Sequence, residues 1–195
     1  MHDVGGQNAL TAIYLGYRVY DTLFEALLIV VSVVAASHMS WYPNVEVTDG
    51  LRSEIESSSM AKFTLRIICP IILLFGAYLA LNGHISAGGG FQGGLAIAVF
   101  FICRYMVYNI YDIHIKTVME IEKLIYINIT VVATIAVFMG VLYLSAEAIP
   151  IWQSVYLIFM NIFIGLKVAC GFFILFYRYI AIERLPAVNE LEDYR

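Results

Sequence analysis

The sequence predicts an all-α, polytopic membrane protein with about five transmembrane helices. Of the 195 residues, 62% are apolar and only 13% are charged, whereas soluble domains carry about 25% charged residues. The apolar residues fall into five runs of about 17–26 residues, the length needed to cross a hydrocarbon core of about 30 Å. Because the runs do not alternate apolar with polar residues, helices are expected rather than membrane β-strands.

The five predicted spans each hold at most one charged side chain. Glu25 lies near the start of the first, Arg66 in the first turn of the second, Arg104 toward the end of the third, and Lys167 inside the fifth. The fourth holds none. In chain order the predicted spans are residues 23–39, 63–81, 91–108, 124–144 and 152–177.

The connections divide the chain into four parts. Residues 1–40 form an N-terminal segment with the first helix, and residues 41–61 a polar linker. Residues 62–180 form a four-helix membrane domain, and residues 181–195 a polar, charged tail.

The basic residues near the helix ends predict the orientation in the membrane, because cytoplasmic loops are enriched in lysine and arginine. Arg18 alone lies on the side of the N-terminus. The opposite side carries eight basic residues: Arg52, Lys62, Arg66, Arg104, Lys116, Lys123, Arg178 and Arg184. We therefore expect the N-terminus and the glycine-rich loop to face out, and the linker and the C-terminus to be cytoplasmic.

Composition also argues against several classes of function. A net charge of −4 does not suit a nucleic-acid surface. Cys69, Cys103 and Cys170 are far apart inside apolar runs, so they predict neither a disulfide framework nor a zinc site. Since no metal motif or catalytic constellation is present, we expect no metal and no cofactor bound by this chain.

Arg18, Asp21 and Glu25 are spaced to share one helix face. If the first helix begins near Asn8, Glu25 lies well inside it, where a carboxylate in the membrane suggests a proton or cation relay. If the helix instead begins at Asp21, both carboxylates lie at its N-terminus and are stabilised by the helix dipole.

Lys167 is near the centre of the fifth run and too deep to reach the membrane surface easily. It must face protein or water, opposite a carboxylate or near carbonyls. It is either a relay lysine or one half of a static ion pair. Glu120, Glu122 and Lys123, at the start of the fourth span, are expected to be solvated.

A glycine-rich stretch joins the second and third spans. His84 follows its first glycine and either titrates near neutral pH or is a hydrogen-bonded structural group. The pattern G-x-G-x-x-G occurs here, but a nucleotide site needs a preceding strand, and membrane helices flank this one. The glycines instead suggest close backbone approach, positive φ and a tight or re-entrant turn. They are Gly83, Gly88, Gly89, Gly90, Gly93 and Gly94.

Residues 61–178 resemble the MnhB/MrpB domain, which is the B subunit of Mrp-type Na⁺/H⁺ antiporters and also occurs in membrane-bound, energy-converting hydrogenases. One departure is Ala87, where the family often has proline. The matching motifs are Arg66-x-x-x-Pro70, Gly76, the stretch from Asn82 to Gly94, and Asn161-x-x-x-Gly165-x-Lys167-Val168.

The N-terminal part is similar to a different segment, the MbhE type, which in antiporters ends the large A subunit. The similarity rests on residues 8–13 with Arg18, Asp21, Thr22 and Glu25. Together the two resemblances imply that the chain fuses both units.

The resemblances imply a place for this chain inside a large assembly in the cell (inner) membrane. Its partners would be other Mrp-type antiporter subunits, the lipid bilayer, Na⁺ and H⁺, and hydrogenase-type redox subunits carrying iron–sulfur clusters and a NiFe centre, with no nucleic acid. Asp21, Glu25, His84 and Lys167 would lie in or near an ion path.

The leading hypothesis is a non-catalytic subunit of a cation/proton module, coupled to a redox arm or standing alone. In it the glycine-rich turn shapes a water-accessible passage. The alternative is a purely structural subunit that bridges or seals the assembly. An independent transporter would show an inverted repeat, which the sequence lacks.

Overall fold

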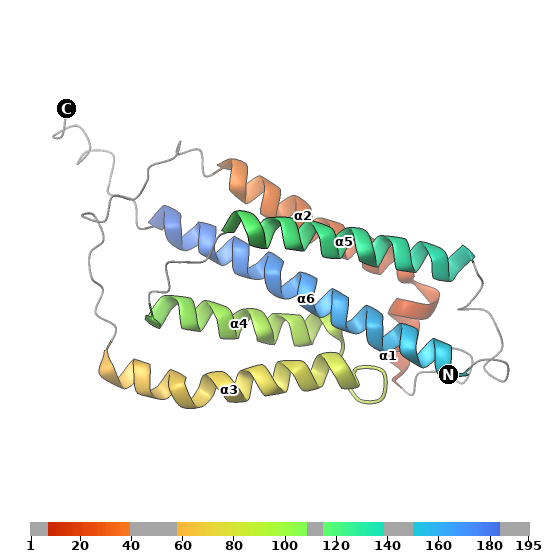
Figure 1. The fold of residues 1–195 in the computed structure, drawn as a ribbon, viewed down its shortest axis with the longest axis horizontal. Coiled ribbons are helices and arrows are strands. Elements are labelled where there is room, and N and C mark those ends of the chain that lie inside the picture. The colour runs from red at the N-terminus through yellow and green to blue at the C-terminus, as the bar shows by residue number, and fades with distance from the viewer. Residues whose placement is uncertain (1–7, 40–57, 109–114, 139–149, 184–195) are drawn as a thin grey trace.

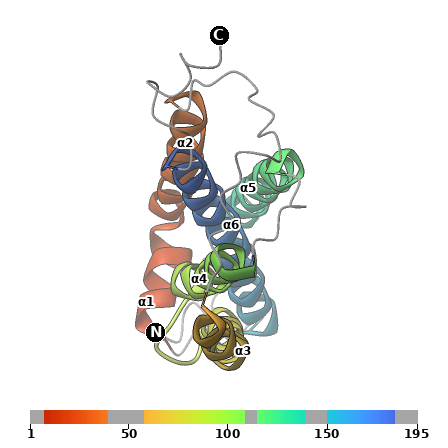
Figure 2. The ribbon, with the colours of Figure 1, turned by 90° about the vertical axis from the view of Figure 1, so that its left-hand side faces the viewer.

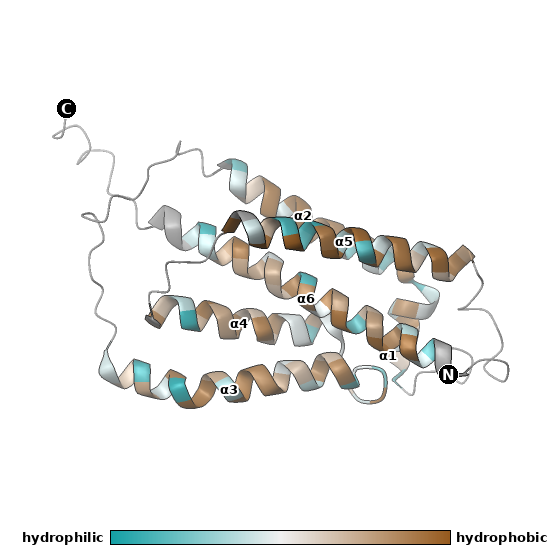
Figure 3. Ribbon diagram, in the orientation of Figure 1, coloured by the Kyte–Doolittle hydropathy of each residue, from teal (hydrophilic) through white to brown (hydrophobic). Residues whose placement is uncertain are grey.

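The computed structural model describes residues 8–39, 58–108, 115–138 and 150–183, and within these ranges every long element is a helix. Among the residues described, five helices are long and apolar enough to cross a membrane, so the chain is an all-α, multi-pass membrane protein. Figure 3 shows how apolar residues dominate these helices. In chain order the elements are α1 (Ala9–Thr11), the π-helix η2 (Ala12–Tyr17), α2 (Val19–Met39), α3 (Ser59–Asn82), α4 (Gly90–Tyr108), α5 (Ile115–Phe138) and α6 (Pro150–Glu183).

Helix α6 is the centre of the bundle. In the end-on view it lies between α2, α4 and α5, and α3 lies beyond α4 (Figure 2). The main apolar core gathers around α6, with Leu157, Met160 and Val168 almost completely buried. A helix that is surrounded by others has to be apolar on nearly all sides, as the sequence of α6 is.

Close packing between α3, α4 and α6 depends on small residues. A methyl group on Gly94 would overlap the backbone of Gly165 in α6, and one on Gly93 would overlap the backbone of Gly76 and Ala80 in α3. In membranes, where no hydrophobic force drives helices together, such close backbone approach supplies the van der Waals contact.

Each of the two expected helix starts lies close to the start of a helix: α1 begins at Ala9, next to Asn8, and α2 begins at Val19, two residues before Asp21. Asn8 caps α1 by accepting a hydrogen bond from the amide of Leu10 at 3.1 Å. The helical path is then broken at Arg18, where φ is −122° and ψ is 34°, and α2 begins at Val19. Asp21 therefore lies in the first turn of α2, and Glu25 lies one turn further into the helix.

Helix α5 begins at Ile115, nine residues before the predicted start of the fourth span at residue 124. The prediction treated residues 115–123 as a connection because they are charged. The charges instead divide between two faces of a helix: Glu120 and Lys123 pair at 3.1 Å on the exposed side, and Glu122 points inward.

Other expectations lie outside the described residues. These are most of the linker 41–61, the predicted end of the fourth span beyond residue 138, and the tail beyond residue 183. The first three residues of the predicted tail, 181–183, still belong to α6.

Candidate functional site

A buried ion pair joins α5 to α6 within the membrane-spanning part of the bundle. The Lys167 ammonium donates to Glu122 Oε1 at 2.9 Å. The two side chains are 0% and 2% exposed. The Lys167 nitrogen also lies 5.7 Å from the centre of the Tyr126 ring, within the range of a cation–π contact. The sequence predicted a carboxylate or carbonyls opposite Lys167, and Glu122 is that carboxylate.

The prediction that Glu122 is solvated is wrong, because it shares the inward face of α5. The buried positions of this helix follow at intervals of three and four residues, which returns them to one side. They are Glu122, Ile125, Ile129, Ala133 and Ala136. That spacing was readable in the sequence and would have placed Glu122 with the apolar residues rather than with Glu120 and Lys123.

Each charge of this pair is stable in the interior only because the opposite charge lies beside it. Moving either ion alone into a low-dielectric interior costs several kcal/mol, which only a close, well-aligned partner offsets. The lysine holds a proton that the carboxylate, in hydrogen-bond contact, is able to receive, so the pair can exist as two ions or as two neutral groups. This is the chemistry that a proton relay needs.

A second polar cluster fastens the N-terminal segment to the glycine-rich turn. The Asn8 side-chain amide donates to the carbonyl oxygens of Gly83 at 2.8 Å and Ser86 at 2.7 Å. The Asn8 backbone N–H donates to the His84 carbonyl at 3.1 Å, and the Thr11 hydroxyl donates to the Gly83 carbonyl. The turn is therefore held by a segment about 75 residues away in sequence, in addition to its own hydrogen bonds to the Asn82 carbonyl.

Asn161 on α6 connects that cluster to α4. Its Oδ1 accepts from the Tyr14 hydroxyl at 2.6 Å and from the Gly90 amide at 3.0 Å, so it caps the first residue of α4. Burial raises the pKa of the Tyr14 phenol, and the charge of Glu25 adds to this. Tyr14, Tyr17 and Tyr20 recur every three residues in the sequence, a spacing that predicts an aromatic belt at the membrane surface. Tyr17 and Tyr20 are exposed, but Tyr14 is half-buried and hydrogen-bonded.

The glycines of the turn serve close approach rather than unusual backbone conformation. None of the glycines in residues 83–94 has a positive φ. A methyl group on Gly89 would overlap the Tyr14 hydroxyl, and one on Gly90 would overlap the Asn161 carbonyl oxygen. The turn is tight, and the expected water-accessible passage beside it stays a prediction.

The other predicted relay residues lie apart from the buried pair. Asp21 forms an exposed ion pair with Arg18, and Glu25 is also exposed. His84 lies on the turn, where its Nδ1 is 3.1 Å from the Leu81 carbonyl oxygen. Of the four residues predicted to lie in an ion path, only Lys167 is buried. Within the described part of the chain no cluster of three or more His, Cys, Asp or Glu residues is arranged to hold a metal ion.

Comparison with known proteins finds a family whose model matches this chain and several proteins similar to part of it. The family described as a domain related to the MnhB subunit of Na⁺/H⁺ antiporters matches residues 60–174. An uncharacterized protein of Methanocaldococcus jannaschii is 30% identical over 52% of this chain and 44% of its own length. A protein named as antiporter subunit mnhB2, from Staphylococcus haemolyticus, is 27% identical over 42% of this chain and 58% of its own. The chain thus spans less than two thirds of either relative.

One solved structure resembles nearly the whole chain. It is a chain of the membrane-bound sulfane sulfur reductase (MBS), an archaeal respiratory membrane complex. The TM-score is 0.75 at 26% sequence identity, covering 90% of this chain and 78% of the other. The likeness therefore extends beyond residues 60–174.

Proposed function

Because the chain belongs to the family of domains related to the MnhB subunit of Na⁺/H⁺ antiporters, we propose that it is a membrane subunit of a Mrp-type cation/proton module. In this role it works only inside a larger assembly in the cell membrane. It contributes a relay to the ion path and carries out no chemical reaction itself.

The observation that carries the relay is the buried Lys167–Glu122 pair. Lys167 lies at the centre of the span Gln153–Tyr179, and Glu122 lies inside the span Thr117–Phe138. A buried charged pair inside membrane spans is costly to keep and is by default a functional site. The proposal assigns the proton-bearing role to Lys167 and the accepting role to Glu122. Asp21, Glu25 and His84 stay candidates for the approach to this pair, because none of them is buried inside the bundle.

We further propose that the module is coupled to a redox arm. The MBS chain, similar over most of its length, belongs to a respiratory complex, which supports this coupling. Iron–sulfur clusters would then lie in partner subunits. A NiFe centre would distinguish a hydrogenase-type arm from a sulfur-reducing one.

A structural role for the same pair is the second candidate. The pair joins α5 to the central helix, so it is also placed to fix the packing of these two helices. In that case removal of a charge would impair assembly, while whatever assembled would transport at the normal rate.

The assembly is tested by tagging the C-terminus, extracting the chain in mild detergent and identifying the co-purifying proteins by mass spectrometry. We expect antiporter-type membrane subunits together with iron–sulfur subunits. If only antiporter-type subunits co-purify, the proposed subunit role stands and the proposed redox arm is refuted. A chain that purifies alone, folded and homogeneous, would contradict the proposal.

The relay is tested in the same complex with Lys167→Ala, and with Lys123→Ala as a matched control because that lysine is half-exposed and pairs at the surface. We expect loss of ion transport only for the first. Normal assembly and a full transport rate for Lys167→Ala would contradict the relay.

A further inference from the structure

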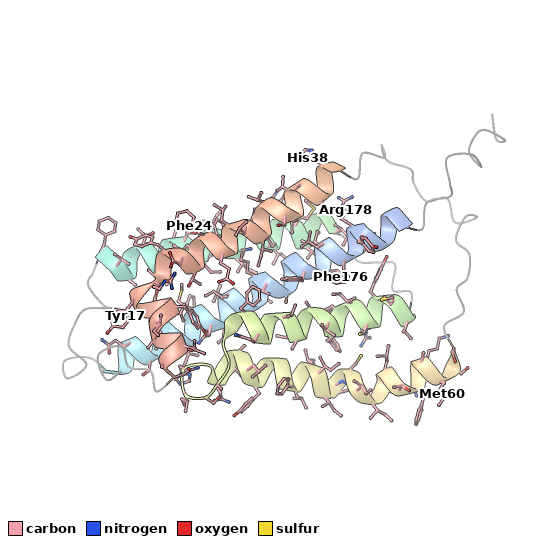
Figure 4. All side chains as sticks on the ribbon, turned by 180° about the vertical axis from the view of Figure 1, so that it is seen from behind. Tyr17, Phe24, His38, Met60, Phe176 and Arg178 are labelled. Atoms are coloured by element: carbon pink, nitrogen blue, oxygen red, sulfur yellow. The ribbon has the colours of Figure 1, made fainter. Side chains whose placement is uncertain are left out.

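The outward surface of α2 differs from an ordinary lipid-facing surface in one respect, which is that a carboxylate, Glu25, is exposed among its apolar side chains. Phe24 and Leu28 on α2 are each 65% exposed, and Tyr17 at the end of η2 is 60% exposed. In Figure 4 Tyr17 and Phe24 point away from the bundle. Glu25 is exposed next to them, on a helix otherwise suited to face hydrocarbon.

Glu25 lies close to the middle of the membrane-spanning layer. It is three to four residues, or about 5 Å, from the centre of the span Val19–His38. Helix α2 runs in the same direction as α6 (Figure 1). A methyl group on Gly171 of α6 would meet Ile29 and Val33 of α2, so the two helices are in contact there. Counting back along both helices places Glu25 near the level of Lys167, which lies at the centre of its own span.

No cation in the described part of the chain pairs with Glu25. The three ion pairs formed between described residues involve other carboxylates: Arg18 pairs with Asp21, Lys123 with Glu120, and Lys167 with Glu122. A carboxylate facing lipid tails at this depth has neither water nor a counter-ion, so it is strongly disfavoured unless another protein covers it.

We propose that the outward surface of α2 around Glu25 binds a transmembrane helix of a partner subunit, and that this helix presents a lysine or arginine at the depth of Glu25. The apolar neighbours Phe24 and Leu28 supply the packing surface and the carboxylate sets the register. A second copy of this chain is disfavoured, because symmetric pairing would bring two Glu25 carboxylates together. The inference uses the assembly part of the proposed function and not the relay role of the buried pair.

The experiment places a photo-crosslinking amino acid at position 24 or 28 in the full complex, in native membranes. Mass spectrometry then identifies the cross-linked peptide. We expect both positions to cross-link to one membrane helix of another subunit, with a lysine or arginine within one turn of the contact. Cross-links to lipid alone, to a second copy of this chain, or to a helix without a basic residue would overturn the proposal.

The charge is tested by the amount of that partner recovered with the tagged chain. Glu25→Gln is expected to lower recovery about tenfold or more, since truncating one partner of a desolvated charge pair mainly increases dissociation. Glu120→Gln is the matched control, because that carboxylate is 74% exposed, and recovery should stay within about twofold.

Charge reversal keeps the test decisive even where Glu25→Gln reduces the amount of folded chain. Glu25→Lys combined with glutamate at the partner's basic position should restore recovery. Full recovery with Glu25→Gln, or no rescue by the exchanged charges, would overturn the proposal. Because recovery is measured without transport, the relay can fail while this interface stands.

Discussion

Removing one member of the buried pair should destabilise the protein far more than removing a surface charge. Lys167→Met leaves the Glu122 carboxylate, 2% exposed, without a cation. Breaking a buried pair in this way costs about 3–5 kcal/mol. Replacing both residues with apolar ones, in Lys167→Met with Glu122→Leu, removes the uncompensated charge, and the cost should fall to about zero or become a gain.

The assay is the melting temperature of the complex in detergent, followed by the tagged chain that stays soluble after heating. A loss of 3–5 kcal/mol corresponds to a fall on the order of 10 °C for a chain of this size. Lys123→Met is the control, because its ion pair with Glu120 is exposed and is worth about 0.5 kcal/mol. If the single and double substitutions lower the melting temperature equally, the two charges are not coupled and the reasoning fails.

Three further predictions concern the polar cluster and the glycines. Asn161→Ala should cost about 2–4 kcal/mol, because it leaves the first amide of α4 and the Tyr14 hydroxyl without their buried acceptor; an unchanged melting temperature would contradict this. Gly94→Ala should abolish assembly, because its methyl would overlap the Gly165 carbonyl oxygen in α6. Gly88→Ala should be milder, because its methyl would come no closer than 3.1 Å to Leu79; equal yields would refute the distinction. Asn8→Ala should release the N-terminal segment and speed its cleavage by added protease, and unchanged digestion would show that the side-chain hydrogen bonds of Asn8 do not hold it.

The sequence predicts the five spans because a run of about 20 apolar residues has few alternatives in a membrane. The start of α5 is not predicted, since residues 115–123 are polar by composition and only their helical spacing shows that one face is apolar. That same spacing would have identified Glu122.

The partner of Lys167 could be foreseen as a chemical type but not as a residue. An isolated ammonium at that depth needs a carboxylate or carbonyls, and several carboxylates in the sequence meet this requirement. Tyr14 and Asn161 are missed for a related reason. Their hydrogen bond joins residues 147 positions apart, and no local sequence pattern in either segment predicts it.

Ion transport by the assembled complex carrying both Lys167→Met and Glu122→Leu tests the relay most directly. The double substitution is expected to preserve folding and assembly while removing every ionisable atom of the pair, so it separates a relay from a structural tie. We predict normal amounts of complex in membrane vesicles and ion transport reduced about tenfold or more, with transport of the Lys123→Met control unchanged. Transport at the full rate in the double variant would contradict the relay and leave the pair a structural tie between α5 and α6.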